Sequence, residues 1–236
     1  MPHTRNTPKC FAKVNGKRIL DWGLESLQAG GLEEVVFIGG YRIESVQEAY
    51  PEFTFCHNAD WENNNILLSL MFAEAYMREG FLCAYSDILY TPGIIKRLVA
   101  SPHPITLVCD SAWRERYVAR TEHPEWDGEK IAADGDRIRA INRTMESEEA
   151  LGEYIGVTRF TPEGANQFCE AFHTARERHN GKPFRAAQTF QKAYLIDLYQ
   201  EMISLGHPLH LVETSGEYME IDTNQDFQIA RSEWTG

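Results

Sequence analysis

The sequence predicts an α/β protein whose sheet is covered by helices on both faces. Short apolar runs of strand length alternate with longer runs that have helical spacing. The short runs are almost continuously apolar, as in strands that are buried on both faces of a parallel sheet. Two of the apolar runs end in an aspartate, Asp87 and Asp222. Ligands of α/β proteins bind at the carboxyl ends of strands, so these two positions are the first candidates for a site.

The first half of the chain supplies most of the predicted sheet. Pro92 is expected at the first position of a helix, where its missing N–H costs little. Gly39 and Gly40 end one of the strands. The predicted strands are 35–38, 53–56, 81–85 and 105–109, and the predicted helices are 19–29, 43–49, 66–78 and 92–99.

The alternation of apolar strands with helices ends after Ser111. Residues 112–150 are rich in charge and turn signals, with one alternating, half-exposed strand at 137–141. Thr161 and Pro162 suit the start of a helix, as N-cap and first helical residue. The remaining predictions are strands at 154–160 and 209–212 and helices at 161–178, 190–204 and 226–234. We find no linker or internal repeat, and we expect one domain over 1–236.

Composition excludes several classes of protein. The 236 residues carry a net charge of −12, which disfavours broad binding to nucleic acid or to an anionic membrane. No apolar run has membrane-spanning length, and the first residues lack the apolar core of a signal peptide. The five cysteines form no C-x-x-C pair, so we expect neither a disulfide framework nor a zinc ribbon. These features are typical of a cytoplasmic protein.

Asp87 and Asp222 together suggest phosphoryl or nucleotidyl transfer. Two carboxylates can share a divalent ion, and such an ion usually holds phosphates. The run around Lys9 adds positive charge suited to a phosphate chain. The alternative is that both aspartates are ordinary strand-end caps.

His207 and His210 are a second candidate metal pair. Its spacing crosses a turn between a loop and a strand, and no nearby carboxylate completes a ligand set. We therefore do not expect a metal at these histidines.

Ordered motifs give the chain a resemblance to a known family. The motifs are Pro8-Lys9, Val14-Asn15-Gly16-Lys17, Gly39-Gly40-Tyr41, the stretch from Asn58 to Leu70, Ser86-Asp87 and Glu220-Ile221-Asp222. Their order resembles that of the sugar-nucleotide pyrophosphorylase-like nucleotidyltransferases, over roughly residues 1–235. The stretch from Asn58 to Leu70 is similar to the branch that activates phosphocholine and phosphonates with CTP.

The resemblance implies a Rossmann-like fold with a mixed, mostly parallel sheet, of the nucleotide-diphospho-sugar transferase type. Residues 112–150 would be an insertion on the acceptor side. Asp87 and Asp222 would hold Mg²⁺, which orients the in-line attack and offsets repulsion between two anions. Lys9 would neutralise the charge that develops as pyrophosphate leaves. No protein nucleophile is needed, because an oxygen of the acceptor attacks.

Further candidates fall on two sides of the implied site. Some of them also have a purely structural interpretation. Asn65 would then be a helix N-cap, Trp61 a core residue, and the segment 113–124 a solvated loop. The nucleotide-binding candidates are Lys9, Gly40, Tyr41, Asn65, Ser69 and Ser86. The acceptor-binding candidates are Trp61, Arg116, Tyr117, Arg120, Glu153 and Lys192.

The implied activity is transfer of CMP from CTP to a small phosphorylated or phosphonylated compound, with release of pyrophosphate. Phosphocholine and 2-aminoethylphosphonate are candidate acceptors. A sugar-1-phosphate nucleotidyltransferase and a non-catalytic nucleotide-binding protein are the alternatives. The sequence leaves open whether the chain forms a homodimer.

One departure from the family concerns the N-terminus. The family opens with a strand and a Gly-rich loop whose backbone N–H groups hold the phosphates. The residues Met1-Pro2-His3-Thr4 resemble the sequence that directly follows this loop in the family. We therefore expect the first strand and the loop to be missing from the chain as given.

Overall fold

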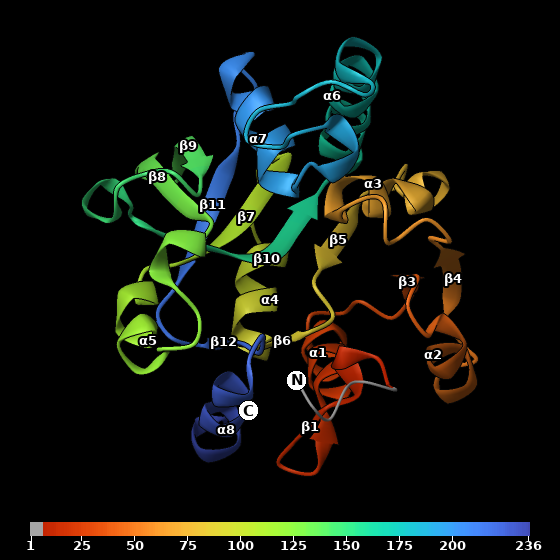
Figure 1. Ribbon diagram of the computed structural model, residues 1–236, viewed down its shortest axis with the longest axis vertical. Coiled ribbons are helices and arrows are strands. Elements are labelled where there is room, and N and C mark those ends of the chain that lie inside the picture. Colours follow the sequence, from red (N-terminus) through yellow and green to blue (C-terminus); the bar gives the residue numbers. More distant parts are fainter. Residues whose placement is uncertain (1–6) are drawn as a thin grey trace.

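The computed structural model describes residues 7–236, and in these residues a central mixed sheet lies between two layers of helices (Figure 1). Its strands are β5 (Phe81–Ala84), β10 (Gly152–Phe160), β7 (Ile105–Asp110), β11 (His210–Thr214), β9 (Arg137–Asn142) and β8 (Lys130–Asp134), in that spatial order. β11 pairs with β7 in parallel, whereas β10 runs antiparallel to β5 and to β7. β9 is antiparallel to both β8 and β11. The sheet is mixed as expected, but the expectation that it is mostly parallel is wrong, because β10 inserts between β5 and β7 in the opposite direction.

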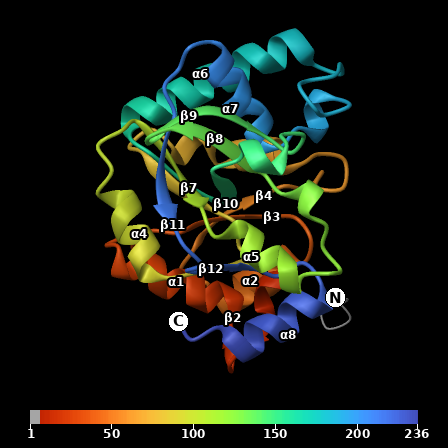
Figure 2. The same cartoon turned by 90° about the vertical axis from the view of Figure 1, so that its left-hand side faces the viewer.

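Both faces of the sheet are buried by apolar packing. On β7, Leu107 and Cys109 belong to the core shared with the upper helices, while Val108 belongs to the core shared with α4 (Pro92–Val99). The upper layer consists of α6 (Pro162–His179) and α7 (Leu195–Ser204), and the lower layer contains α4 and α1 (Ile19–Ala29), as Figure 2 shows.

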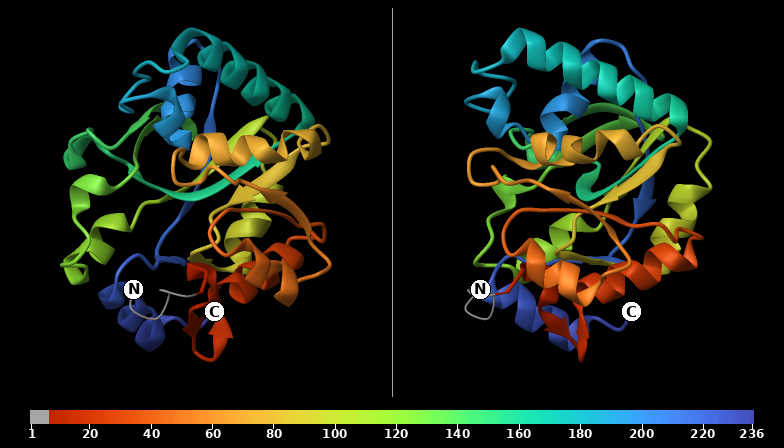
Figure 3. Two further views of the ribbon diagram at one scale, coloured as in Figure 1. Left: turned by 45° about the vertical axis from the view of Figure 1, so that its right-hand side comes forward. Right: turned by 90° about the vertical axis from the view of Figure 1, so that its right-hand side faces the viewer.

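Three small two-stranded sheets accompany the main one within residues 7–236. β3 (Val36–Gly39) and β4 (Thr54–His57) are parallel and are not hydrogen-bonded to β5. Above them lie α3 (Ile66–Leu70) and the 3₁₀ turn Met71–Tyr76, with α2 (Ile43–Ala49) at the far edge (Figure 3). β1 (Lys13–Val14) and β2 (Lys17–Arg18) form a hairpin. β6 (Ile88–Tyr90) and β12 (Tyr218–Glu220) pair in antiparallel fashion, and this ladder positions the candidate site.

The remaining elements are short or terminal. α5 (Trp113–Ala119) lies in the segment predicted to be charged and loop-like, and α8 (Asn224–Glu233) follows β12. The 3₁₀ turns are Lys9–Phe11, Glu125–Asp127, Ser147–Glu149 and Phe190–Lys192. In the described part of the chain, no helix combines the length and apolar character needed to cross a bilayer.

Many predicted boundaries are confirmed. α1, α2 and α4 have the predicted ends, and the Thr161 hydroxyl accepts a hydrogen bond from the Gly164 backbone, which confirms the N-cap of α6. The predicted helix at 66–78 is wrong in its second half, which forms a 3₁₀ turn, and the helix predicted from 190 starts at Leu195. The expectations for Met1 to Thr4, and for a loop before them, lie outside the described residues.

Candidate active site

Lys9 joins two carboxylates that are far apart in the sequence. Its ammonium group donates a hydrogen bond to Asp87 at 2.8 Å and a second one to Asp222. Asp87 precedes β6 and Asp222 follows β12, and the pairing of Ile88 with Glu220 in that ladder brings the two aspartates together. The structure therefore gathers the three residues that the sequence analysis selected for charge stabilisation and metal binding.

The three charges stabilise one another in a partly buried setting. Burial alone lowers the pKa of Lys9, but the charges of Asp87 and Asp222 outweigh it and hold this pKa above its usual value. Burial would raise the pKa of Asp222, and the ammonium group of Lys9 reverses that effect, so the pKa is lowered. The site thus keeps the charged ammonium group of Lys9 between the carboxyl groups of Asp87 and Asp222.

A buried ion pair fixes the backbone that carries Asp222. Arg120 donates to Asp226 at 2.8 Å and to Glu220 at 3.1 Å. The same Asp226 carboxylate accepts hydrogen bonds from the backbone N–H groups of Asp222, at 3.0 Å, and Thr223, at 2.8 Å. Asp226 is the third residue of α8, and the Thr223 hydroxyl accepts from its N–H, which forms a capping box. Asp222 is therefore held at a helix N-terminus that is anchored through Asp226 to α5.

His123 is a member of the site that the sequence analysis did not select. Its Nδ1 atom lies 3.6 Å from Asp222, and its Nε2 atom lies 4.0 Å from Glu220 and 3.8 Å from Asp127. His123, Glu220 and Asp222 are close enough to serve one metal ion. The charge-rich pattern of residues 112–150 points to its arginines and aromatic residues and gives no separate signal for His123.

A polar pocket of about 110 Å³ adjoins Asp222. Its walls combine carboxylates with tyrosines. The lining residues are Tyr85, His123, Asp127, Glu129, Arg143, Glu153, Tyr154, Ile155, Gly156, Tyr218, Glu220 and Asp222. Carboxylates and aromatic faces are the groups that bind an ammonium ion, so the pocket has the chemistry for a cationic ligand.

Two of the pocket carboxyl groups have raised pKa values. Burial raises the pKa of Glu129 to about 7, even though Arg143 donates to it at 3.1 Å and opposes the shift. Burial, together with the nearby charges of Asp222 and Glu153, raises the pKa of Glu220 to about 8. The negative charge of the pocket therefore increases through the neutral pH range.

A glycine makes room for one wall of this pocket. Gly156 has a φ of +80°, and a Cβ atom at this position would lie 2.4 Å from the ring of Tyr85. Both the backbone conformation and the close approach require glycine.

The predicted acceptor residues on α5 are bound to other protein groups. Arg116 donates to Glu153 at 2.5 Å and also pairs with Asp110, and the Tyr117 hydroxyl donates to Glu153 at 2.7 Å. The side chain of Arg120 is 5% exposed in its pair with Asp226. The structure places Arg116, Tyr117 and Arg120 in internal networks, while Glu153 lines the pocket; their contact with an acceptor stays a prediction.

The predicted nucleotide side lies at the ends of β3 and β4. The rings of Tyr41 and Trp61 meet edge to face at 5.6 Å, and both side chains are exposed. A Cβ atom on Gly40 would lie 2.4 Å from Trp61, so this glycine lets the indole lie across the backbone. Trp61 is thus a surface residue next to Tyr41, which leaves its alternative role as a core residue without support.

Polar residues around α3 hold the neighbouring loop. Asn65 accepts from the Ile66 N–H at 2.8 Å, as a helix N-cap, and donates to the Lys192 carbonyl at 3.2 Å. Ser69 accepts from Asn58 at 3.2 Å, and Lys192 donates to the Glu62 carbonyl at 2.9 Å. Lys192 thus lies against the 58–65 loop. Ser86, next to Asp87, is exposed and interacts with the thiol of Cys10. The ligand roles of Asn65, Ser69, Ser86 and Lys192 stay predictions.

The donor set fits Mg²⁺. Asp87 and Asp222 offer carboxylate oxygens, which Mg²⁺ prefers. The ammonium group of Lys9 already lies between these oxygens, so the position accommodates positive charge. His123 adds a nitrogen ligand that would suit other divalent ions better.

Comparison with known proteins assigns the fold to a class. The chain has the α/β fold of the nucleotidyltransferases: over 98% of its length it superposes on 91% of the CTP:phosphocholine cytidylyltransferase of Streptococcus pneumoniae, with a TM-score of 0.74 and 19% identity. Among curated proteins it is similar to the CTP:phosphoglutamine cytidylyltransferase of Campylobacter jejuni, with 22% identity over 97% of this chain and 93% of that protein. A shorter match, with 28% identity over 35% of each chain, is to the 2-aminoethylphosphonate cytidylyltransferase of Lancefieldella rimae. No family model matches. The resemblance to the nucleotidyltransferases and to their cytidylyltransferase branch is thereby confirmed.

Proposed function

We propose that this protein is a Mg²⁺-dependent cytidylyltransferase that transfers CMP from CTP to a small phosphorylated or phosphonylated compound and releases pyrophosphate. The observation that carries the proposal is the cluster of Lys9, Asp87 and Asp222 beside a pocket of the right chemistry for an acceptor. The similarity to cytidylyltransferases supports the nucleotide and the acceptor class.

The residues have separate roles in this reaction. Asp87 and Asp222 would hold Mg²⁺, which when bound offsets the charge between the two anions that must meet. Lys9 would then turn its ammonium group to the phosphates and stabilise the charge that develops on the leaving pyrophosphate. A phosphate or phosphonate oxygen of the acceptor attacks the α-phosphorus of CTP, the bond from that phosphorus to the bridging oxygen breaks, and pyrophosphate carries the electron pair away.

The pocket favours an acceptor with a cationic group. The carboxylates of Asp127, Glu129, Glu153, Glu220 and Asp222 line it. They outnumber the arginines that pair with them, which are Arg143 (with Asp127 and Glu129), Arg116 (with Glu153) and Arg120 (with Glu220). The ammonium group of 2-aminoethylphosphonate or the quaternary group of phosphocholine would be held by these carboxylates and by the tyrosine rings. The hydroxyl groups of a sugar can also donate to these carboxylates, but they lack the charge–charge attraction that an ammonium group adds.

A panel assay tests the proposal. Pyrophosphate release would be measured with CTP, UTP, ATP and GTP against phosphocholine, 2-aminoethylphosphonate, phosphoglutamine and glucose 1-phosphate. We expect turnover with CTP and a cationic acceptor. A preference for UTP and the sugar phosphate would assign the protein to the sugar branch, and no turnover with any pair would favour a non-catalytic nucleotide-binding protein.

Substitutions then connect the activity to the site. Asp87→Asn and Asp222→Asn should each lower turnover by about a hundredfold or more while the fold is retained, because each removes a metal-binding charge. Asp134→Asn changes an exposed carboxylate at the end of β8 and is the matched control, so its turnover should equal that of the wild type. Near-normal turnover in both active-site variants would remove the two aspartates from the metal site.

A further inference from the structure

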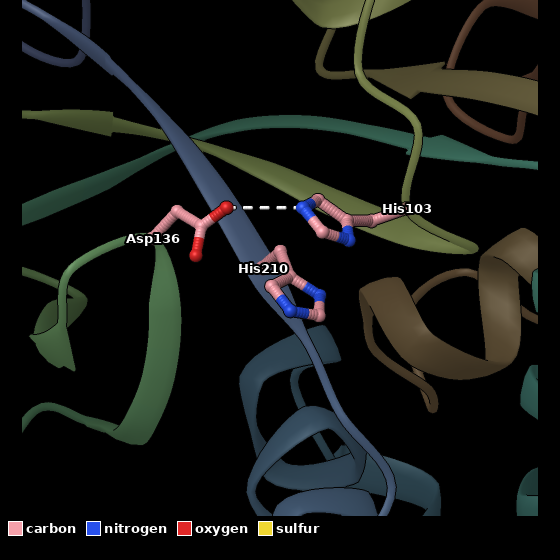
Figure 4. Close-up of side chains that lie close together, drawn as sticks. All are labelled: His103, Asp136 and His210. Carbon is pink, nitrogen blue, oxygen red and sulfur yellow. Dashed lines mark hydrogen bonds and ion pairs between the residues drawn. The ribbon is translucent and has the colours of Figure 1, made fainter.

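A second cluster of potential metal ligands lies at the other end of the sheet. His103 precedes β7, His210 begins β11, and Asp136 lies in the turn between β8 and β9 (Figure 4). The acceptor pocket borders Glu153, which pairs with Asp110 at the far end of β7. β7 spans Ile105 to Asp110, so the two places are roughly 16 Å apart by the rise per residue of a strand.

The three side chains are already close together. His103 Nε2 lies 3.0 Å from an Asp136 oxygen, and the rings of His103 and His210 stack at 3.5 Å with planes 8° apart. One ligand atom from each of the three residues lies within 4.8 Å of the others. Asp136 is more than half exposed and His103 is partly exposed, so an ion can reach them from solvent.

An ordinary ion pair accounts for only part of this arrangement. It explains His103 and Asp136 but not His210, whose Nδ1 atom is buried and has no hydrogen-bond partner within residues 7–236. A buried polar atom without a partner is unfavourable and calls for water or an ion.

We propose that His103, Asp136 and His210 form a zinc site separate from the active site. Two imidazole nitrogens and one carboxylate oxygen form a ligand set that suits Zn²⁺, with water in the fourth position, whereas Mg²⁺ prefers oxygen ligands alone. On binding, the two rings turn out of their parallel stack so that a nitrogen of each points at the ion.

The ion would reinforce the contact between the β8–β9 hairpin and β11 within the sheet. β9 and β11 share only the pair Arg137 and His210, with hydrogen bonds from Ile138 to Leu209 and from Leu211 to Asp136 beside it. One ligand from the hairpin turn, one from the segment before β7 and one from the start of β11 would reinforce this short contact. The expected effect of the metal is therefore to stabilise this end of the sheet.

Cobalt provides a direct test, because tetrahedral Co²⁺ bound to nitrogen and oxygen absorbs visible light. The full-length protein would be titrated with Co²⁺ in a large excess of Mg²⁺, and Zn²⁺ would then be added as a competitor. We expect one Co²⁺ per chain with a visible spectrum that Zn²⁺ abolishes, and a rise in Tm on addition of Zn²⁺.

Matched variants localise the signal. His103→Asn and Asp136→Asn change partly exposed residues and should fold, and each should weaken Co²⁺ binding by more than about tenfold, since even an outer-shell change costs about that much. Asp134→Asn, at the end of β8 next to this turn, and His207→Asn, near His210, should bind Co²⁺ as the wild type does. His123→Asn tests the alternative that Co²⁺ binds in the active site, and it should also leave the spectrum unchanged.

Three results would overturn the proposal. They are the absence of Co²⁺ binding in the wild type, equal binding in the wild type and in both His103→Asn and Asp136→Asn, and loss of the spectrum in His123→Asn but not in Asp136→Asn. Pyrophosphate release by Asp136→Asn should match the wild type, so failure of this proposal is distinguishable from failure of the proposed function.

Discussion

The ammonium group of Lys9 lies 2.8 Å from the carboxylate of Asp87, and it also bonds to Asp222 on its other side. Lys9 therefore neutralises the two carboxylates when no other cation does so. In the proposed function, Mg²⁺ would compete with this ammonium group for the carboxylates, and its binding would release Lys9 toward the phosphates of CTP. Metal binding and the position of Lys9 would then be linked, because binding of the ion frees the ammonium group to face the phosphates.

This linkage predicts opposite effects on metal binding and on turnover. Lys9→Met should bind Mg²⁺ more tightly than the wild type, because no ammonium group competes for the carboxylates. Its turnover should fall by about a hundredfold, because no charge faces the leaving pyrophosphate. Calorimetric titration with Mg²⁺ and the pyrophosphate assay measure the two effects.

Lys17→Met is the matched control, since Lys17 forms an exposed pair with Glu25. It should change neither quantity. Weaker Mg²⁺ binding in Lys9→Met would show that the lysine supports the ion rather than competing with it.

The buried pair of Arg120 and Asp226 is predicted to stabilise the fold. Arg120→Ala would leave the Asp226 charge buried without its partner, at a cost of about 3–5 kcal/mol in the free energy of unfolding. Turnover should also fall, because Asp226 holds the backbone of Asp222. Urea unfolding measures the stability, and Arg139→Ala, which breaks an exposed pair with Asp134, should cost no more than about 1 kcal/mol. Normal stability together with a raised acceptor KM in Arg120→Ala would instead favour direct contact with the acceptor.

Gly156 and Gly16 allow backbone strain to be separated from steric contact. Both have positive φ, +80° and +84°, but a Cβ atom on Gly156 would meet Tyr85 whereas one on Gly16 meets nothing within 4 Å. Gly16→Ala should lower the free energy of unfolding by about 1–2 kcal/mol, because of the left-handed backbone alone. Gly156→Ala should cost a further 1–3 kcal/mol, roughly, from overpacking, and should raise the acceptor KM by displacing the tyrosine. Equal losses of stability in the two variants would mean that the ring of Tyr85 moves aside freely.

The raised pKa values of Glu129 and Glu220 predict a dependence of acceptor binding on pH. The two groups titrate at about 7 and about 8, so at pH 6 both are mostly protonated and the pocket holds less negative charge. The KM for a cationic acceptor should therefore fall as pH rises from about 6 to about 8.5. Glu220→Gln should flatten the upper part of this profile, and an unchanged profile would remove Glu220 from the acceptor site.

The same shifts predict the sign of the stability change. Both carboxyl groups stay protonated in the fold at pH values where they ionise in the unfolded chain, whose value is near 4.5. The folded state then binds more protons, so stability falls as pH rises from about 4.5 to about 8. Melting curves over this range should show a smaller decline in Glu220→Gln than in the wild type.

Sequence patterns predicted elements well where apolar spacing was regular. α1, α2 and α4 were predicted to their ends, whereas α5 was missed because arginines surround its two buried aromatic residues, Trp113 and Tyr117. The i, i+4 spacing of that pair was the available signal. β6 and β12 have three residues each, too few to show a period, yet they align the site.

The candidate site was predictable only in part, because many of its contacts join segments that are far apart in the sequence. Strand ends pointed to Asp87 and Asp222, but the partners of Arg116 and Arg120 depend on contacts between distant segments, which a charge-rich run does not reveal. His210 was set aside for lack of a nearby carboxylate, and the fold supplies Asp136 from the β8–β9 turn. His123 was missed because the two carboxylates that make it part of the site, Glu220 and Asp222, come from β12 and the residues just after it.

Lys9 and Asp222 are separated by 213 residues, which has a consequence for how the protein is made. During synthesis, the segments from β1 to α7 leave the ribosome before β12 can pair with β6. Closing so large a loop is slow, because much chain entropy is lost before the contact forms. Until then the pair of Lys9 and Asp87 lacks Asp222. Nascent chains halted before residue 218 should therefore be inactive even when most of the core has folded. The site is therefore completed only when β12 and Asp222 join the elements that are translated before them.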